Sequence, residues 1–145
     1  MKILVSSCLL GVECRYCGTG YPQNKVIELQ KKHILIPICP EQLGGLPTPR
    51  QSVELVKNEA GDKFGVNYTE SFRKGANETL KIAQLLGIKY AILKVNSPSC
   101  GFGRIYDGTF SGKLNEGNGV TANLLSQNGI RIFNEKTIEE RYFID

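Results

Sequence analysis

The chain has 145 residues, with 18 Lys or Arg against 14 Asp or Glu, which gives a net charge of +4. A chain of this length can bury a sizeable core and does not need disulfides to fold. It has neither an opening signal-peptide pattern nor an apolar run of roughly 20 residues, which argues against secreted and membrane proteins. We therefore expect one domain over residues 1–145, located in the cytoplasm, as a monomer or a homodimer.

The positive charges are spread along the chain instead of forming a basic tract. Binding to a nucleic acid backbone favours clustered Lys and Arg side chains. The charge pattern therefore permits a nucleic acid partner without requiring one.

The first third of the chain predicts two strands separated by a helix. Residues 2–6, KILVS, are largely apolar on both faces, which is typical of a strand buried on both sides. Residues 24–33 have a helix-compatible pattern, and residues 34–38, ILIPI, predict the next strand. Pro37 favours the edge of the sheet for that strand, because proline cannot donate to a sheet ladder. Residues 39–50 are predicted as a loop from their prolines and paired glycines.

The middle of the chain predicts a long helix and a long loop around another buried strand. Residues 52–56 are predicted as a short outer strand. Apolar residues recur every three or four positions over residues 69–86, which predicts a helix that ends at Gly87. Residues 90–95, YAILKV, predict a buried strand. The glycine-rich stretch 96–119 is predicted as a long loop, and such loops are usually functional.

The last part of the chain predicts a helix at residues 120–127, a strand at 130–133 and a short C-terminal helix. Strands and helices thus alternate along the chain. Because parallel strands need a helix-length connection, this alternation predicts a mostly parallel central sheet with helices on both faces. The expected fold class is α/β, a small three-layer Rossmann-like sandwich.

Three of the five cysteines closely follow predicted buried strands. Cys8 lies two residues past the first strand, Cys39 lies one residue past the second, and Cys100 follows the strand at 90–95. In an open parallel sheet the loops at the carboxyl ends of the strands meet at one edge and bind ligands. A single cysteine is more often a packing residue, but this convergence predicts a shared site.

The residues alone leave the ligand of this site open. Three thiolates suit an iron–sulfur cluster with one open iron, whereas a structural zinc ion needs four ligands and would add Cys14. Cys14 and Cys17, in CRYC, also have the spacing of a redox dithiol. The glycines after Cys17 do not, however, form the helix start expected of a thioredoxin-like motif.

Three motifs resemble the bacterial family catalogued as domain of unknown function 523 (DUF523), whose studied branch is the iron–sulfur-dependent thiouracil desulfurases. They are SCLLG, CPEQLGGLPTPR, and SPSCGFGRIYDGTFSGKL followed by GNGVTANLL, and the resemblance covers essentially the whole chain. It implies a [4Fe-4S] cluster held by three cysteines. The implied reaction is the non-redox removal of sulfur, as sulfide, from a small thiolated base such as thiouracil.

The resemblance also implies roles for individual residues. The cluster ligands are Cys8, Cys39 and Cys100, the same three residues that the sheet argument selects. Glu41 matches the catalytic carboxylate and would act as the general base for water. Ser97 matches the active-site serine, with Ser99 in the same motif as the alternative.

One position departs from the family pattern. This chain has RYCG where many relatives have RYDG, so Cys17 replaces an aspartate. Whether the activity or the preferred substrate differs as a result is left open, and Cys14 is either a fourth ligand or a pocket thiol.

Three alternative functions follow from the same residues. The first is a four-cysteine zinc module without catalysis, and the second is a dithiol oxidoreductase using Cys14 and Cys17. The third, desulfuration of thiolated RNA instead of a free base, is disfavoured by the modest charge.

Other polar and aromatic residues have ordinary expected roles. Arg50 and Arg104 lie in polar loops and are expected in solvent, with substrate contact as the alternative. Tyr106 and Phe102 are expected to pack, with stacking on a base as the alternative.

Overall fold

A computed structural model describes residues 1–143, and a four-stranded parallel sheet forms its centre. From one edge to the other, the strands are β2 (Ile34–Ile38), β1 (Lys2–Ser6), β5 (Tyr90–Ile92) and β8 (Arg131–Phe133). Every neighbouring pair runs parallel. The predicted α/β class with a parallel central sheet is therefore confirmed.

The sheet is buried on both faces, as the apolar sequence of β1 predicts. Ile3 and Val5 contribute to one core cluster and Leu4 to the other, because successive side chains of a strand point to opposite faces. All three side chains are fully buried. Pro37 lies in β2 at the edge of the sheet, where a missing N–H group is tolerated.

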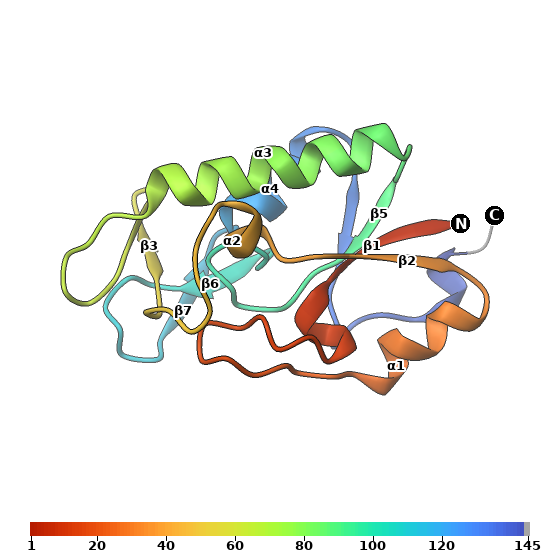
Figure 1. Cartoon of the computed structure of the whole chain (residues 1–145), viewed down its shortest axis with the longest axis horizontal. Coiled ribbons are helices and arrows are strands. Elements are labelled where there is room, and N and C mark those ends of the chain that lie inside the picture. The colour runs from red at the N-terminus through yellow and green to blue at the C-terminus, as the bar shows by residue number, and fades with distance from the viewer. Residues whose placement is uncertain (144–145) are drawn as a thin grey trace.

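Helices form the two outer layers of the fold (Figure 1). The long α3 (Thr69–Leu85) and α4 (Val120–Gln127) pack on one face, and α1 (Asn24–Ile27) lies on the other. Both α3 and α4 agree closely with their predicted ranges, and Gly87, at a φ of 65°, follows the end of α3. Within residues 1–143, none of the helices combines the length and the apolar character needed to cross a lipid bilayer.

Two predicted helices are partly 3-10 in form. The helix predicted at 24–33 continues from α1 as the 3-10 helix η2 (Glu28–Lys31). The short C-terminal helix is η3 (Glu140–Phe143), also 3-10. Short helices often take this tighter form, which the apolar spacing of a sequence does not distinguish.

The segment 39–50, predicted as a loop, contains a one-turn helix, α2 (Pro40–Leu43). Pro40 occupies its first position, where the fixed φ of proline suits a helix start and its missing N–H group has no helical partner to lose. The residue before this helix is Cys39, and Glu41 lies in its first turn.

Two hairpins replace other parts of the predicted organisation. The strand expected at 52–56 is shorter, β3 (Glu54–Val56), and pairs with β4 (Glu59–Gly61) instead of extending the central sheet. The loop expected at 96–119 contains the hairpin of β6 (Arg104–Tyr106) and β7 (Leu114–Glu116). Strands of three residues are too short to produce a periodic signal.

Two glycines allow α2 to lie directly against α3. A Cβ atom on Gly75 of α3 would overlap the carbonyl oxygen of Pro40, and one on Gly44 would overlap the carbonyl oxygen of Ser71. Because Cys39 and Glu41 flank Pro40, this backbone contact fixes where both side chains lie relative to the sheet.

We expect Gly75→Ala to lower the free energy of unfolding by about 1–3 kcal/mol, since the added methyl group forces α2 away from α3. Lys74→Ala, at the exposed neighbouring position, is the matched control. Thermal unfolding of the two variants beside the parent chain measures the difference. Equal stability of the two variants would contradict the tight contact between α2 and α3.

Candidate functional site

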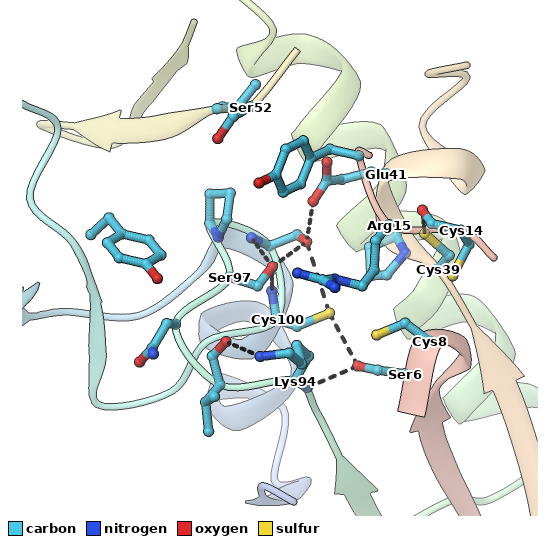
Figure 2. Close-up of a pocket in the computed structure, with 18 of the residues that line it drawn as sticks. Ser6, Cys8, Cys14, Arg15, Cys39, Glu41, Ser52, Lys94, Ser97 and Cys100 are labelled. Atoms are coloured by element: carbon cyan, nitrogen blue, oxygen red, sulfur yellow. Dashed lines mark hydrogen bonds between the residues drawn. The ribbon is translucent and has the colours of Figure 1, made fainter. Parts of the chain in front are cut away.

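A cavity of about 420 Å³ lies at the carboxyl end of the central sheet (Figure 2). The chain runs from β1 to β2 on one side and then returns to β5 on the other side of β1, so the order of the strands reverses between β1 and β5. Ligands of doubly wound sheets bind at such a switch point. The residues that follow β1, β2 and β5 line the cavity.

Four thiols line this cavity: Cys8, Cys14, Cys39 and Cys100. Cys8 lies in the 3-10 turn η1 (Ser7–Leu10) after β1, Cys39 directly follows β2, and Cys100 follows β5. The structure therefore brings together the three cysteines that the sequence selects, and it adds Cys14. Cys39 is half-buried and the other three are buried.

The environments of Cys14, Cys39 and Cys100 raise the pKa of each thiol, which favours the protonated form when no metal is bound. Burial raises the pKa of Cys100 to about 12, against the opposing effect of a hydrogen bond from Ser6. The hydrogen bond with Cys14, together with burial, raises the pKa of Cys39. Contact with Cys39 lowers the pKa of Cys14, but contact with Cys8 and burial outweigh it and bring the value to about 11. Metal binding here would therefore release protons.

The four thiols supply the donor type that iron–sulfur clusters use. Among the side chains that the structure describes, no three His, Cys, Asp or Glu groups are placed to hold one metal ion. The four thiols instead line a common cavity, and cysteine thiolates are the usual ligands of iron–sulfur clusters. This geometry does not favour the alternative of a four-cysteine zinc site.

Glu41 is held by a buried arginine. Nε of Arg50 donates to Oε1 of Glu41 at 2.9 Å, and the two side chains are only 7% and 13% exposed, respectively. Arg50 also donates to the carbonyl oxygens of Cys14 and Pro47 at 2.8 and 3.2 Å and to Oγ1 of Thr48 at 2.8 Å. The expectation that Arg50 lies in solvent is therefore wrong. Its planar guanidinium group connects the carboxylate to the backbone of the Cys14 loop.

The other oxygen of Glu41 faces two serines. Oγ of Ser99 donates to Oε2 of Glu41 at 3.0 Å and lies 3.0 Å from Oγ of Ser97. The backbone N–H groups of Ser99 and Cys100 donate to Oγ of Ser97 at 3.2 and 3.1 Å. The proton of Ser97 can therefore point to Ser99, whose own proton points to Glu41. Both serines belong to one hydrogen-bonded chain that ends at the carboxylate.

Arg50→Lys is expected to lower the free energy of unfolding by about 1–3 kcal/mol, because an ammonium group cannot replace the guanidinium fork and leaves buried oxygens unpaired. Arg15→Lys is the control, since Arg15 has one long, exposed hydrogen bond, to Thr19 at 3.4 Å. Urea denaturation of both variants checks this, and an Arg50→Lys midpoint equal to that of the parent would refute the structural role of Arg50.

The β6–β7 hairpin supplies the remaining wall of the cavity. The buried Oε1 of Glu54, in β3, accepts hydrogen bonds from the N–H groups of Gly108 and Phe110 at 3.0 and 3.1 Å. Tyr106 and Phe110 line the cavity and are each 37% exposed. This role of Glu54 could not be predicted from the sequence, because its partners are backbone groups in a distant loop.

The two thiols of CRYC lie in different environments. Cys14 is buried at the cavity, whereas Cys17 is exposed and is not part of the cavity wall. A hydrogen bond with Thr19 lowers the pKa of Cys17. This separation does not favour a dithiol centre built from the two residues.

Ser6 is a site residue that the sequence reasoning missed. It lines the cavity, is buried, and donates a hydrogen bond to Sγ of Cys100 at 3.3 Å. A polar residue at the end of an otherwise apolar buried strand was the available signal, because buried hydroxyl groups require a partner.

Comparisons with known proteins agree with this geometry. The family model described as 2-thiouracil desulfurase matches residues 3–137. The chain is 43% identical over 148 residues to the uncharacterized protein YbbK of Bacillus subtilis (strain 168). This match covers 95% of this chain and 98% of YbbK. It also matches the solved structure of the [4Fe-4S]-dependent thiouracil desulfidase TudS (DUF523Vcz), with a TM-score of 0.90 and 40% identity over 94% of this chain and 92% of that one.

Proposed function

Because the chain belongs to the 2-thiouracil desulfurase family, we propose that it is a [4Fe-4S]-dependent enzyme that removes sulfur from a small thiolated pyrimidine. In this reaction a carbon–sulfur bond breaks, a carbon–oxygen bond to water forms, and the sulfur leaves as sulfide without electron transfer. The observation that carries the proposal is that four thiols and the chain of Glu41, Ser99 and Ser97 line one cavity. The volume of this cavity lies within the range of small-molecule sites.

Cys8, Cys39 and Cys100 are the proposed cluster ligands. They follow three neighbouring strands of the sheet, so a rigid scaffold holds each one at the cavity. Cys14 comes from the loop after η1 and contacts Cys8 and Cys39. When bound, the cluster supplies a Lewis-acidic iron with affinity for the soft sulfur of a thiocarbonyl group.

Glu41 is the proposed general base that takes a proton from the attacking water. Arg50 fixes one carboxylate oxygen and leaves the other directed at Ser99. Ser97 lies at the end of the hydrogen-bonded chain that is farthest from Glu41. There its hydroxyl group can orient water and pass a proton through Ser99 to Glu41. We therefore propose that Ser97 orients the water and that Ser99 connects Ser97 to the carboxylate.

Anaerobic reconstitution with iron and sulfide tests the proposal. The protein is expected to turn brown, to contain iron and acid-labile sulfide, and to release hydrosulfide from 2-thiouracil or 4-thiouracil in equal amount to the uracil formed. Apo protein treated identically but without iron is the control. A colourless anaerobic preparation with stoichiometric zinc and no sulfide release would overturn the proposal.

A further inference from the structure

Ser6 is an unusual residue for its place in the fold. It ends β1 after Ile3, Leu4 and Val5, which are all fully buried, and it is itself only 2% exposed. A hydroxyl group in such a position costs free energy unless it is hydrogen-bonded. An apolar residue would satisfy the packing of a central strand equally well, so the hydroxyl group itself calls for an explanation.

Both side-chain hydrogen bonds of Ser6 join the end of β1 to the segment that follows β5. Its Oγ accepts from the backbone N–H of Lys94 at 3.0 Å and donates to Sγ of Cys100 at 3.3 Å (Figure 2). The paired register of β1 and β5 stops at Val5 and Ile92, so Ser6 provides a partner for Lys94 beyond the last pair. Since the Lys94 N–H group occupies a lone pair of the hydroxyl oxygen, the one hydroxyl proton is directed at Cys100.

Ser99 is a weaker candidate for the same role. Its Oγ lies 3.8 Å from Sγ of Cys100 but only 3.0 Å from Oε2 of Glu41. Because a serine hydroxyl has a single proton, that proton goes to the closer and charged acceptor. Ser6 is therefore the hydroxyl donor available to the sulfur of Cys100.

We propose that Ser6 is a positioning residue for the cluster, which donates a hydrogen bond to the sulfur of Cys100 when that sulfur is bound to iron. This inference rests on the proposed function, which makes Cys100 a ligand. Hydrogen bonds to ligand sulfurs withdraw electron density from the metal and raise the reduction potential of a cluster. Outer partners of this kind also orient the ligand, and their loss weakens metal binding by roughly 10–100-fold.

Ser6→Ala is the first test. After anaerobic reconstitution, the variant is expected to have a more negative cluster reduction potential than the parent protein. It should also lose iron to a chelator about 10-fold faster. Ser7→Ala is the matched control, because it removes a neighbouring hydroxyl group from the same cavity wall. A Ser6→Ala protein with the potential and iron-loss rate of the parent would overturn the inference.

A matched pair of larger side chains keeps the test decisive if alanine prevents folding or cluster uptake. Ser6→Thr and Ser6→Val differ only in a hydroxyl group against a methyl group, so any packing effect is common to both. The threonine variant is expected to keep the parent potential and the valine variant to shift it to more negative values. Equal potentials in the two variants would overturn the inference alone, whereas a parent protein that takes up no cluster would overturn the proposed function first.

Discussion

Cys100→Ser is expected to abolish cluster binding and to lower sulfide release by at least about 100-fold. Losing only a residue that hydrogen-bonds a metal ligand can already cost up to about 100-fold, and losing the ligand itself should cost more. Cys100 is buried in the wall of the cavity at the switch point of the sheet. A serine hydroxyl stays protonated near neutral pH and is a poor ligand for iron. Iron and acid-labile sulfide content after reconstitution measures the loss directly, and the sulfide-release assay measures its consequence.

Cys17→Ser is the matched control, since it makes the same chemical change at an exposed thiol outside the cavity wall. It is expected to leave both the cluster and the activity close to those of the parent protein. The opposite pattern, with Cys17→Ser inactive and Cys100→Ser active, would identify a dithiol oxidoreductase instead.

Cys14→Ser separates the fourth thiol from the three proposed ligands. Because Cys8, Cys39 and Cys100 are the proposed ligands, this variant is expected to retain a cluster. The rate at which it loses iron to a chelator, compared with that of the parent protein, measures this retention. Absence of a cluster in Cys14→Ser would show that all four thiols of the cavity are needed.

The three cysteines that follow the strands of the central sheet could be predicted as site residues from the sequence. Apolar runs such as residues 2–6 identify buried strands, and the rule that ligands gather at the carboxyl ends of parallel strands brings Cys8, Cys39 and Cys100 to one edge. The position of these cysteines depends only on the strands and their direction, which the helical connections determine. The structure places β2, β1 and β5 side by side, as the argument requires.

The polar network around Glu41 could not be predicted in the same way. Arg50 lies nine residues from Glu41 in a segment with two prolines and two glycines between them, so no periodicity relates the two side chains. Their contact depends on the one-turn helix α2, and α2 depends in turn on the backbone contact at Gly75. A helix of four residues has no repeat of apolar positions by which a sequence could reveal it.

Glu41→Gln is expected to lower kcat for sulfide release by about 100–10,000-fold, the usual contribution of a general base, while the cluster content stays near that of the parent. Glutamine keeps the size of the side chain but cannot take a proton from water, and its single carbonyl oxygen can accept from Arg50 or from Ser99 but not from both. Because the thiols of the cavity are unchanged, absorbance and iron content separate lost chemistry from lost cofactor. Glu13→Gln, at an exposed position, is the control for the loss of one negative charge.

Variants of the two serines test whether the proton reaches Glu41 through them. Ser97→Ala removes the hydroxyl group at the far end of the chain and should lower kcat by about 100-fold, within the range for an acid–base group. Ser99→Ala interrupts the only connection in the described residues between Ser97 and Oε2 of Glu41. If the proton follows these hydrogen bonds, the double variant with both Ser97→Ala and Ser99→Ala should be no slower than the slower single variant. The reason is that the effects of groups that act as a unit are not additive. Losses that multiply in the double variant would show instead that the two serines do not act as one unit.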